Sequence, residues 1–574
     1  MNNTIRQTTA RRGLRTAWAL ALVAVLAACG AGKEDDTSQP QQPTGPAPTR
    51  AEAARFLAQA TYGPTDASIN ALAQSNYSTW LDTQFNQPQL PHRTHLARRA
   101  DELGANMQTV SQTQFRESYW AQALTGPDQL RQRAAFALSQ VFVISFVDGN
   151  LANQTRGVTA YYDMLAEKSF GNFRDLLESV SLHPMMGTYL TSLRNQKEDT
   201  TTGRVADENY AREIMQLFTI GLYELNNDGT YRGGTPTETY THEDIKGLAK
   251  VFTGFSWYAG PNLADRTNSR FFGGNANAER DIRPMQAYNQ YHSVSEKRFL
   301  GTVIPAAGTA NADADLRIAL DTLFNHRNVG PFIGKLLIQR MVTSNPSPAY
   351  VGRVAAAFNN NGSGVRGDMK AVWRAILLDP EARTYDASST SYGKVREPIL
   401  RLSHFLRAFK VTSTTGNFTG LDNTDNTTNN LGQSALRSPT VFNFFRPGFA
   451  PPNSAAAAAG LVSPELQLAN EVSVAGYLNY LRSNWLTVNA GRDLQLDFSA
   501  ELALADNPGA LVDRLNLLLM SGQMSSALRT QIIDGITGRA IPTTNQTNID
   551  AAKRDRVFIG ILLTMASPDY MIQK

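Results

Sequence analysis

The chain has 574 residues, of which 42% are hydrophobic and 18% are charged. This composition excludes a disordered protein, and the length predicts several domains or one large helical body. No apolar run reaches the ~18 residues that a membrane-spanning helix needs, so no spanning helix is expected. The formal charge of +4 disappears once the arginine-rich N-terminal segment is removed, so we expect no nucleic-acid partner.

The first residues are arranged like a secretory signal. Four arginines and no acid precede an apolar run from Ala17 to Ala28. The run ends in Leu26-Ala27-Ala28-Cys29, which resembles the bacterial lipobox, where the cysteine is lipidated and becomes the new N-terminus. The pair Arg11-Arg12 leaves twin-arginine export open beside the general route.

Cys29 is the only cysteine, which excludes an intramolecular disulfide. The alternative to lipidation is an ordinary signal with a chance cysteine. Several acyl chains on Cys29 would hold the protein to the membrane, because a single chain binds only weakly. Gly30 stands where Asp would favour inner-membrane retention. We therefore expect residues 1–28 to be a signal peptide and the mature protein to be an outer-membrane lipoprotein of the cell envelope.

Residues 29–50 are rich in Pro, Gly, Gln and Ser and are expected to be a flexible tether. Residues 51–574 show mostly helical spacing of apolar residues, which predicts a mainly α-helical domain with long loops. The helices that this spacing predicts are Ala51–Ala60, Ser68–Phe85, Phe115–Leu124, Gln129–Ser145, Phe173–Leu182, Asn209–Leu225, Glu243–Phe252, Ala314–Phe324, Val329–Thr343, Ala349–Asn359, Met369–Leu378, Pro398–Phe409, Leu511–Leu519, Ser525–Gly535 and Asp555–Ala566.

The segment Glu208–Gly229 combines an apolar stripe with a polar cluster. Glu208 and Arg212 are i,i+4 partners opposite the stripe, and Glu213 lies at its edge. A half-desolvated edge acid has a raised pKa, which suits it to proton transfer. An exposed ion pair on a packing helix is the alternative. If the cluster is catalytic, Glu208 or Glu213 is the acid/base, Arg212 its charge partner and the nearby His183 a candidate assistant.

The turn after this segment imitates the start of a calcium-binding loop. Glu224, Asn226 and Asp228 alternate and are followed by Gly229. Thr235 stands where such a loop needs its bidentate glutamate, so a plain Asp-Gly turn explains the pattern as well. We carry Ca²⁺ forward as a candidate cofactor at these three residues.

A Gly- and aromatic-rich excursion is predicted within the helical domain at residues 254–305. It contains Trp257 and Tyr258, which are candidates for a stacking platform for sugars, with core packing as the alternative. Its end, His292–Pro305, is predicted to form a short strand or hairpin. Further long loops are expected at Val411–Pro439 and Arg446–Pro464, and long loops are often functional.

Several motifs along the chain carry a family resemblance. ENYAREIMQLFTIGLYEL and YTHEDIKGLAKVFTGFSW, with AARFLAQATYGPT near residue 53 and SPTVFNFFRPGFAPP near 438, resemble the bacterial domain of unknown function 1800. The resemblance implies a secreted, largely helical protein. It also implies an exported partner from a second family of unknown function, numbered 1501. Many members carry a tryptophan and paired histidines where this chain has Phe136–Gln140, so no metal role is carried over to that position.

Two classes of function remain open. The first is a carboxylate-based hydrolase or lyase acting on an envelope or extracellular polymer. The second is a non-enzymatic envelope factor that binds or assembles another exported protein. The sequence lacks H-E-x-x-H, paired C-x-x-C, a phosphate-binding glycine loop and G-x-S-x-G, which removes the simplest metalloprotease, nucleotide-binding and serine-hydrolase interpretations.

Overall fold

The first helix of the folded chain begins where the Thr49 hydroxyl accepts a hydrogen bond from the Glu52 amide and the Glu52 carboxylate accepts one from the Thr49 amide. This capping box satisfies amide groups that the first helical turn leaves free. The computed structural model describes residues 45–107, 109–422, 424–487 and 491–574. The predicted signal peptide, Cys29 and most of the predicted tether therefore lie outside the described residues.

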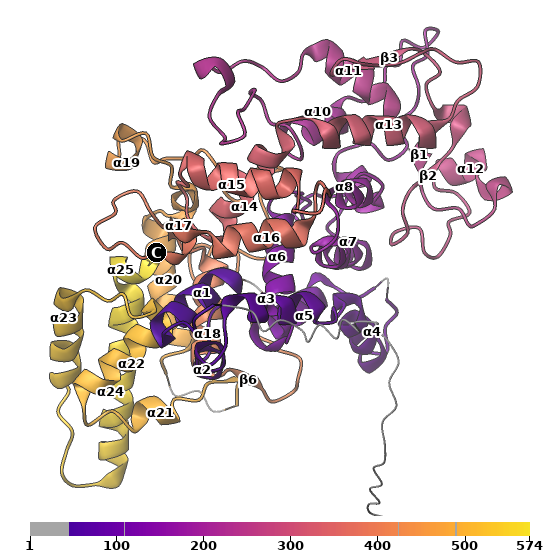
Figure 1. The fold of residues 1–574 in the computed structure, drawn as a ribbon. Helices are drawn as coiled ribbons and strands as arrows, with labels where there is room; N and C mark the ends of the chain where they lie inside the picture. Colours follow the sequence, from indigo (N-terminus) through magenta and orange to yellow (C-terminus); the bar gives the residue numbers. More distant parts are fainter. Residues whose placement is uncertain (1–44, 108, 423, 488–490) are drawn as a thin grey trace, which may run out of the picture. The chain divides into compact units, whose positions relative to one another are not determined.

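Helices dominate the described residues, which confirms the predicted fold class (Figure 1). None of the described helices is both long and apolar enough to cross a membrane. The helices of the N-terminal part are α1 (Arg50–Ala60), α2 (Asp66–Ala73), α3 (Tyr77–Asn86), α4 (His92–Glu102), α5 (Gln112–Thr125), α6 (Gln129–Ser139), α7 (Thr155–Lys168), α8 (Phe173–Ser181) and α9 (Pro184–Tyr189).

The middle of the chain alternates helices with short antiparallel strand pairs. Strand β1 pairs with β2, and β3 pairs with β4 to form the hairpin predicted within residues 292–305. The elements are α10 (Asn209–Gln216), η1 (Arg232–Gly234), α11 (His242–Val251), β1 (Phe255–Ser256), η2 (Leu263–Asp265), α12 (Asn268–Phe271), β2 (Gln286–Ala287), η3 (Asn289–Tyr291), β3 (Lys297–Phe299) and β4 (Thr302–Ile304).

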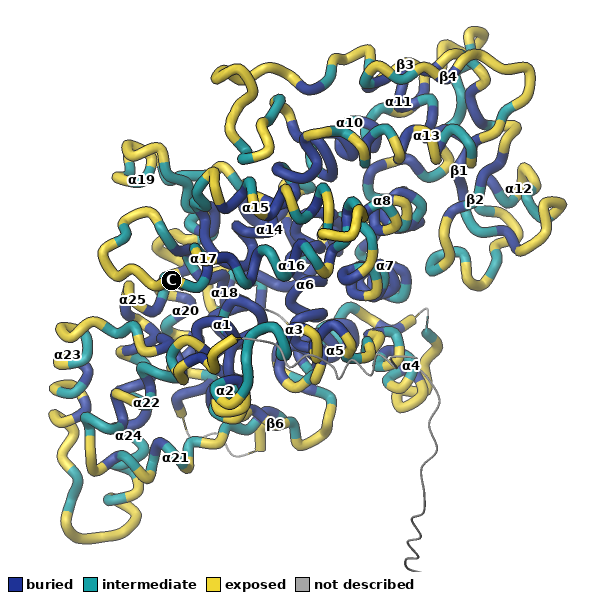
Figure 2. The backbone as a smooth tube through the Cα atoms, in the orientation of Figure 1, coloured by how far each residue is buried: buried dark blue, intermediate teal, exposed yellow. Residues whose placement is uncertain are grey.

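The interior of the described body includes α6 and, from the next part of the chain, α18. Every residue of α18 and of α6 is buried, and both run dark blue through the centre of Figure 2. Buried arginines of α18 donate to backbone carbonyls, as Arg407 does to Gly63 and Leu124. The elements are α13 (Ala312–Asn325), α14 (Val329–Met341), α15 (Pro348–Asn359), α16 (Met369–Leu378), α17 (Pro380–Arg383), β5 (Lys394–Val395), α18 (Pro398–Ala408) and β6 (Thr412–Ser413).

The last part of the chain returns to this interior. Strand β8 pairs with β5, which places Gln573 beside Lys394, and β6 pairs with β7. The elements are α19 (Ala455–Ala458), η4 (Pro464–Leu468), α20 (Glu471–Asn484), β7 (Leu494–Gln495), α21 (Ser499–Leu502), α22 (Pro508–Met520), α23 (Ser526–Thr537), α24 (Gln546–Ala566), α25 (Pro568–Met571) and β8 (Ile572–Gln573).

One helix differs from its prediction in a way that shapes the site. The apolar stripe predicted a helix over Asn209–Leu225, but α10 ends at Gln216. The amides of Ile220 and Gly221 both bond the carbonyl of Met215, and Gly221 adopts a left-handed φ of 72° that suits glycine. The residues after Gly221 leave the helical path and form a surface hairpin.

Candidate functional site

The hairpin that follows α10 is fixed by one buried amide. Isolated bridges join Tyr223 to Glu238 and Leu225 to Tyr231. The Asn328 side chain, at the start of α14, donates to the carbonyls of Ile220 and Tyr223 at 2.9 and 2.7 Å, and it accepts from the Leu225 amide at 3.0 Å. These bonds satisfy backbone groups that neither a helix nor a sheet satisfies here, so the hairpin is held in one place.

Leu222 and Tyr223 of this hairpin line three adjoining hollows. We call them the large, middle and small hollows, with volumes of about 870, 330 and 310 Å³, and together they form the groove. The large and middle hollows also share Phe332, Leu336 and Pro447. The groove therefore runs between the hairpin, α14 and the loop after Arg446 that the sequence marked as long.

The large hollow mixes aromatic, amide and backbone groups. Glycines form part of its wall, and the amides of Gly221, Gly229, Gly234 and Gly460 bond to carbonyls within the chain. Tyr231 and Phe332 provide aromatic faces, while Gln339 and Asn345 provide side-chain amides. Lys335 is its one charged lining residue, and none of the described lining residues is acidic.

The middle hollow is largely apolar, with its polar groups at the base and the rim. Gln140 and Arg340 are buried, Arg446 is exposed and Gln216 is half-buried. The Arg340 guanidinium lies 4.5 Å above the Phe445 ring, and Arg446 lies 5.0 Å above Phe442. The apolar wall consists of Val141, Leu217, Leu222, Tyr223, Phe332, Leu336, Val441, Phe442 and Pro447.

The small hollow contains part of the polar cluster predicted from the sequence. Arg212 and His242 line it. Glu208 lies 3.5 Å from Arg212 and 3.7 Å from Nδ1 of His242, so it holds both side chains at the rim. The structure thus brings Glu208 and Arg212 together beside a hollow, and adds His242, which the sequence analysis did not name. Its position at the start of α11, directly after the capping Thr241, was the available signal.

Glu213 lies behind the groove wall and not within its lining. Its side chain is buried, with 7% of its surface exposed, and its Oε2 forms no hydrogen bond with the described residues. Burial raises the pKa of Glu213, and the charge of Arg212 opposes that shift only in part. Glu213 on α10 is therefore a desolvated acid, as its position at the edge of the apolar stripe suggested.

His183 lies away from these residues in a structural position. It caps α9, where its Nδ1 accepts from the Met185 amide at 3.3 Å, and its ring packs edge-on against Tyr161. Burial lowers the pKa of His183 to about 3, so the ring is neutral at physiological pH. His183 lines none of the three hollows, and its neutral ring serves as a helix cap.

The three candidate calcium ligands form internal contacts. Glu224 lies 3.5 and 3.8 Å from Arg232 and Arg327, Asn226 donates to Thr230, and Asp228 accepts from both the amide and the hydroxyl of that threonine. These bonds lower the pKa of Asp228. No group of three His, Cys, Asp or Glu side chains that could hold a metal ion occurs in the part of the chain that the structure describes. The geometry fits an Asp-Gly turn.

The two candidate stacking residues are already covered by cations. Trp257 carries the Arg280 guanidinium 4.9 Å from its ring centre, and Tyr258 carries Arg283 at 5.9 Å. A sugar that stacks on the same ring faces would have to displace these arginines.

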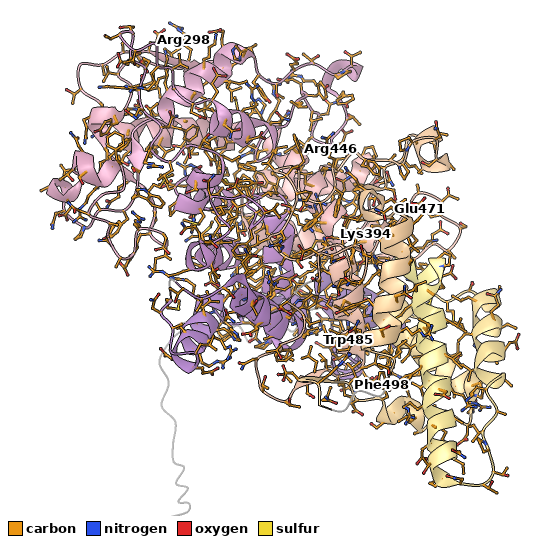
Figure 3. The ribbon with its side chains drawn as sticks, turned by 180° about the vertical axis from the view of Figure 1, so that it is seen from behind. Arg298, Lys394, Arg446, Glu471, Trp485 and Phe498 are labelled. Atoms are coloured by element: carbon orange, nitrogen blue, oxygen red, sulfur yellow. The ribbon has the colours of Figure 1, made fainter. Side chains whose placement is uncertain are left out.

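A buried charge cluster beneath the middle hollow was not predicted. Lys394 lies 3.1 Å from Glu465 and 3.6 Å from Glu397, and it donates to the Arg340 carbonyl at 2.9 Å. Arg133 donates to the same carbonyl at 2.5 Å. Figure 3 labels Lys394 among the interior helices and Arg446 above it in that view. No local sequence pattern marks this cluster, because its members come from α6, α14, β5, η4 and the N-cap of α18.

The charges in this cluster shift one another's protonation. Although burial alone would raise it, the pKa of Glu397 is held below its usual value by the surrounding cations, Lys394 first. Burial raises the pKa of Glu465, and Lys394 offsets this only in part. Glu397 is therefore the ionised member that balances the buried cations.

Comparison with known proteins identifies a family for this chain. A family model described as Protein of unknown function (DUF1800) matches residues 55–572. No curated protein and no solved structure matches the chain. The match spans nearly the whole described body and confirms the family resemblance that the motifs predicted.

Proposed function

The chain belongs to the DUF1800 family of proteins of unknown function, and we propose that it is a lipid-anchored cell-envelope protein that binds an extended segment of another exported protein in the groove. The observation that carries this proposal is that three hollows adjoin along Leu222 and Tyr223. A connected run of hollows suits an extended chain, which places successive side chains in successive pockets.

The chemistry of the groove favours a peptide over a glycan. A sugar needs a dense set of hydrogen-bonding side chains, whereas the wall of the middle hollow is mostly aliphatic and aromatic. The exported family numbered 1501 is the candidate source of such a peptide.

The test compares a groove residue with a matched residue elsewhere. Leu222 lines all three hollows and is 45% exposed, while Leu103, at the end of α4 and outside the groove, is 54% exposed. We expect labelled random peptides to bind the wild type and Leu103→Asp equally in fluorescence anisotropy. Leu222→Asp should bind them at least about tenfold more weakly, because its carboxylate faces an apolar wall.

Soluble peptidoglycan fragments serve as the competing probe. Binding of these fragments without binding of peptides, or equal peptide binding by both variants, would overturn the proposal. Both substitutions lie at exposed positions, so circular dichroism should show the same folding for both proteins.

A carboxylate-based hydrolase or lyase is the second candidate, and one observation favours it. Glu213 is a buried acid with a raised pKa, and its neighbours Arg212 and Gln216 line the small hollow. Such an acid suits proton donation to a leaving group. Glu213 itself is not part of the lining, and for this reason we place binding first.

A further inference from the structure

The base of the middle hollow contains a guanidinium group without a hydrogen-bonding partner. Arg340 is 3% exposed and lines this hollow, yet its Nε bonds to nothing among the described residues and its other nitrogens have no bonding partner there either. A buried charge is normally paired and hydrogen-bonded, because desolvation without compensation is costly. A guanidinium that lines a hollow and has unbonded donors therefore suits an anionic ligand.

The neighbouring acids do not hydrogen-bond this guanidinium, although Oε1 of Glu397 and Oε2 of Glu465 also lack a hydrogen bond among the described residues. Glu397 accepts from Gln140 and Gln433 at 2.5 and 2.8 Å, and Glu465 pairs with Lys394. Neither of these acids hydrogen-bonds the Arg340 side chain. They attract it electrostatically, and Phe445 supports its flat face, so the guanidinium is held in place with its donors unused.

The charge around the large and middle hollows is of one sign. Lys335, Arg340 and Arg446 line them, and none of the three forms an ion pair with a described acid. No acidic residue occurs among the described residues that line these two hollows. A one-sign cleft with apolar walls attracts an anion and rejects a cation.

The rest of the middle hollow indicates which ligand groups it can accommodate beside an anion. Its walls are aliphatic and aromatic, and its volume of about 330 Å³ suits one or two apolar side chains. Gln140 presents its nitrogen to Glu397, which leaves its Oε1 without a hydrogen bond among the described residues. The hollow thus combines an anion site and an apolar pocket, with an amide acceptor beside them for an N–H group.

We propose that the middle hollow binds the free C-terminal residue of a partner protein, whose carboxylate pairs with Arg340 and whose apolar side chain fills the hollow. Arg446 at the rim adds attraction for the carboxylate, and the preceding peptide runs into the large hollow. This inference rests on the proposed function and specifies which end of the partner is bound. A forked guanidinium fits the two oxygens of a carboxylate, which no internal peptide bond supplies.

The test needs no variant for its first step. Two pools of labelled peptides are prepared, with random sequences that end in Leu, Ile, Val or Phe, one pool with a free carboxylate and the other with a C-terminal amide. We expect the full chain to bind the acid pool at least about tenfold more tightly than the amide pool in fluorescence anisotropy, because an amide loses the charge-assisted bonds.

Variants then assign this difference to the hollow. Arg340→Gln should remove the preference for the acid pool, and Arg340→Lys should keep part of it, because lysine retains the charge but not the fork. Arg446→Gln, at an exposed position, should reduce the preference without a change in folding. Val441→Trp should fill the hollow and weaken binding of both pools.

The outcomes separate this inference from the proposed function. Equal binding of both pools, blocked by Val441→Trp, would overturn the C-terminal inference and leave the groove as a peptide site. Binding of neither pool would overturn both. Binding of labelled palmitate in preference to the acid pool would also overturn the inference, because the same carboxylate chemistry would then belong to a lipid.

Discussion

Glu208 and Glu213 lie on the same short segment but in different electrostatic surroundings. Glu208 is half-buried at the rim of the small hollow, between Arg212 and His242. Glu213, one and a half turns further along, is buried with one carboxylate oxygen unbonded. The first residue orders side chains around a hollow, whereas the second is an acid that its environment keeps from ionising readily. Because both residues are glutamates, the difference between them comes from their exposure to solvent.

The raised pKa of Glu213 predicts a pH-dependent cost to stability. The folded chain holds this proton above the ordinary value of 4.5, at which the unfolded chain releases it. As pH rises from 4.5 to the raised pKa, the folded state binds more protons than the unfolded state, so the free energy of unfolding falls. Glu213→Gln should therefore gain stability relative to the wild type between about pH 4 and about pH 7.

Urea titrations of both proteins at the two pH values measure this difference. Identical pH dependence in both would show that the buried carboxyl does not titrate as its surroundings require. The same variant, with Glu208→Gln beside it, also tests the hydrolase candidate on envelope polysaccharides. A catalytic acid should lose about 10²–10⁴-fold in rate, whereas full activity in both folded variants would end that candidate.

At the scale of elements, α11 shows how one helical face organises the excursion. Asp244 accepts from the Leu300 amide at 2.7 Å, and Lys250 donates to the Glu296 carbonyl at 3.0 Å. Gly247 lies between them, against the backbone of Arg298. The three residues recur every third position and so share one face of the helix. This face holds the β3–β4 hairpin in place, and the capping box at Thr241 fixes where the helix starts.

The close approach at Gly247 predicts a large effect of one methyl group. A Cβ at this position would lie 1.7 Å from the Arg298 carbonyl oxygen, so the hairpin must move away. Gly247→Ala should cost about 1–3 kcal/mol or more in the free energy of unfolding, the range of overpacked cores. Hydrogen exchange of the β3 and β4 amides should also become faster.

Gly538→Ala is the matched control. It lies at the end of α23, where the closest heavy atom to an added Cβ is 3.5 Å away and the backbone φ is −58°. It should leave stability unchanged or raise it slightly, because alanine narrows the unfolded ensemble. Equal unfolding midpoints for the two variants would contradict the packing that is described for α11.

For the whole molecule, the proposed function requires that the groove works at a membrane surface. We expect Cys29→Ser to release the protein from the membrane fraction, because the lipid on this cysteine is the proposed attachment. Immunoblots of fractionated cells measure the release, and Arg11→Lys, which preserves a basic signal, tests the twin-arginine route in parallel. Membrane retention of the Cys29→Ser protein would refute the lipid anchor.

The groove itself is a property of the assembled body. Its walls come from the hairpin after α10, from α14 and from the loop after Arg446, segments that lie about 90 residues or more apart in the sequence. The hairpin and α14 are locked together by Asn328, whose side chain bonds three backbone groups. Asn328 is a single loop residue between two predicted helices, and nothing in its local sequence marks this role.

The sequence by itself determined the mainly helical class, the family and the hairpin near residue 300. These features depend on local spacing and on motifs that lie within a few turns of chain. The ends of the helices were predicted less well from the sequence. Helix α10 ends at Gln216, because Gly221 adopts a left-handed conformation where it packs against Phe332 of α14. A contact with a distant helix overrode the local apolar period.

Only the tertiary structure decided where the chemistry lies. It separated Glu213 and His183 from the groove lining, covered Trp257 and Tyr258 with arginines, and gathered Arg133, Arg340, Lys394, Glu397 and Glu465 beneath the middle hollow. The physical reason is desolvation. Burial sets whether a charged group is paired, protonated or left open to a ligand, and burial arises from segments that meet only in the folded body.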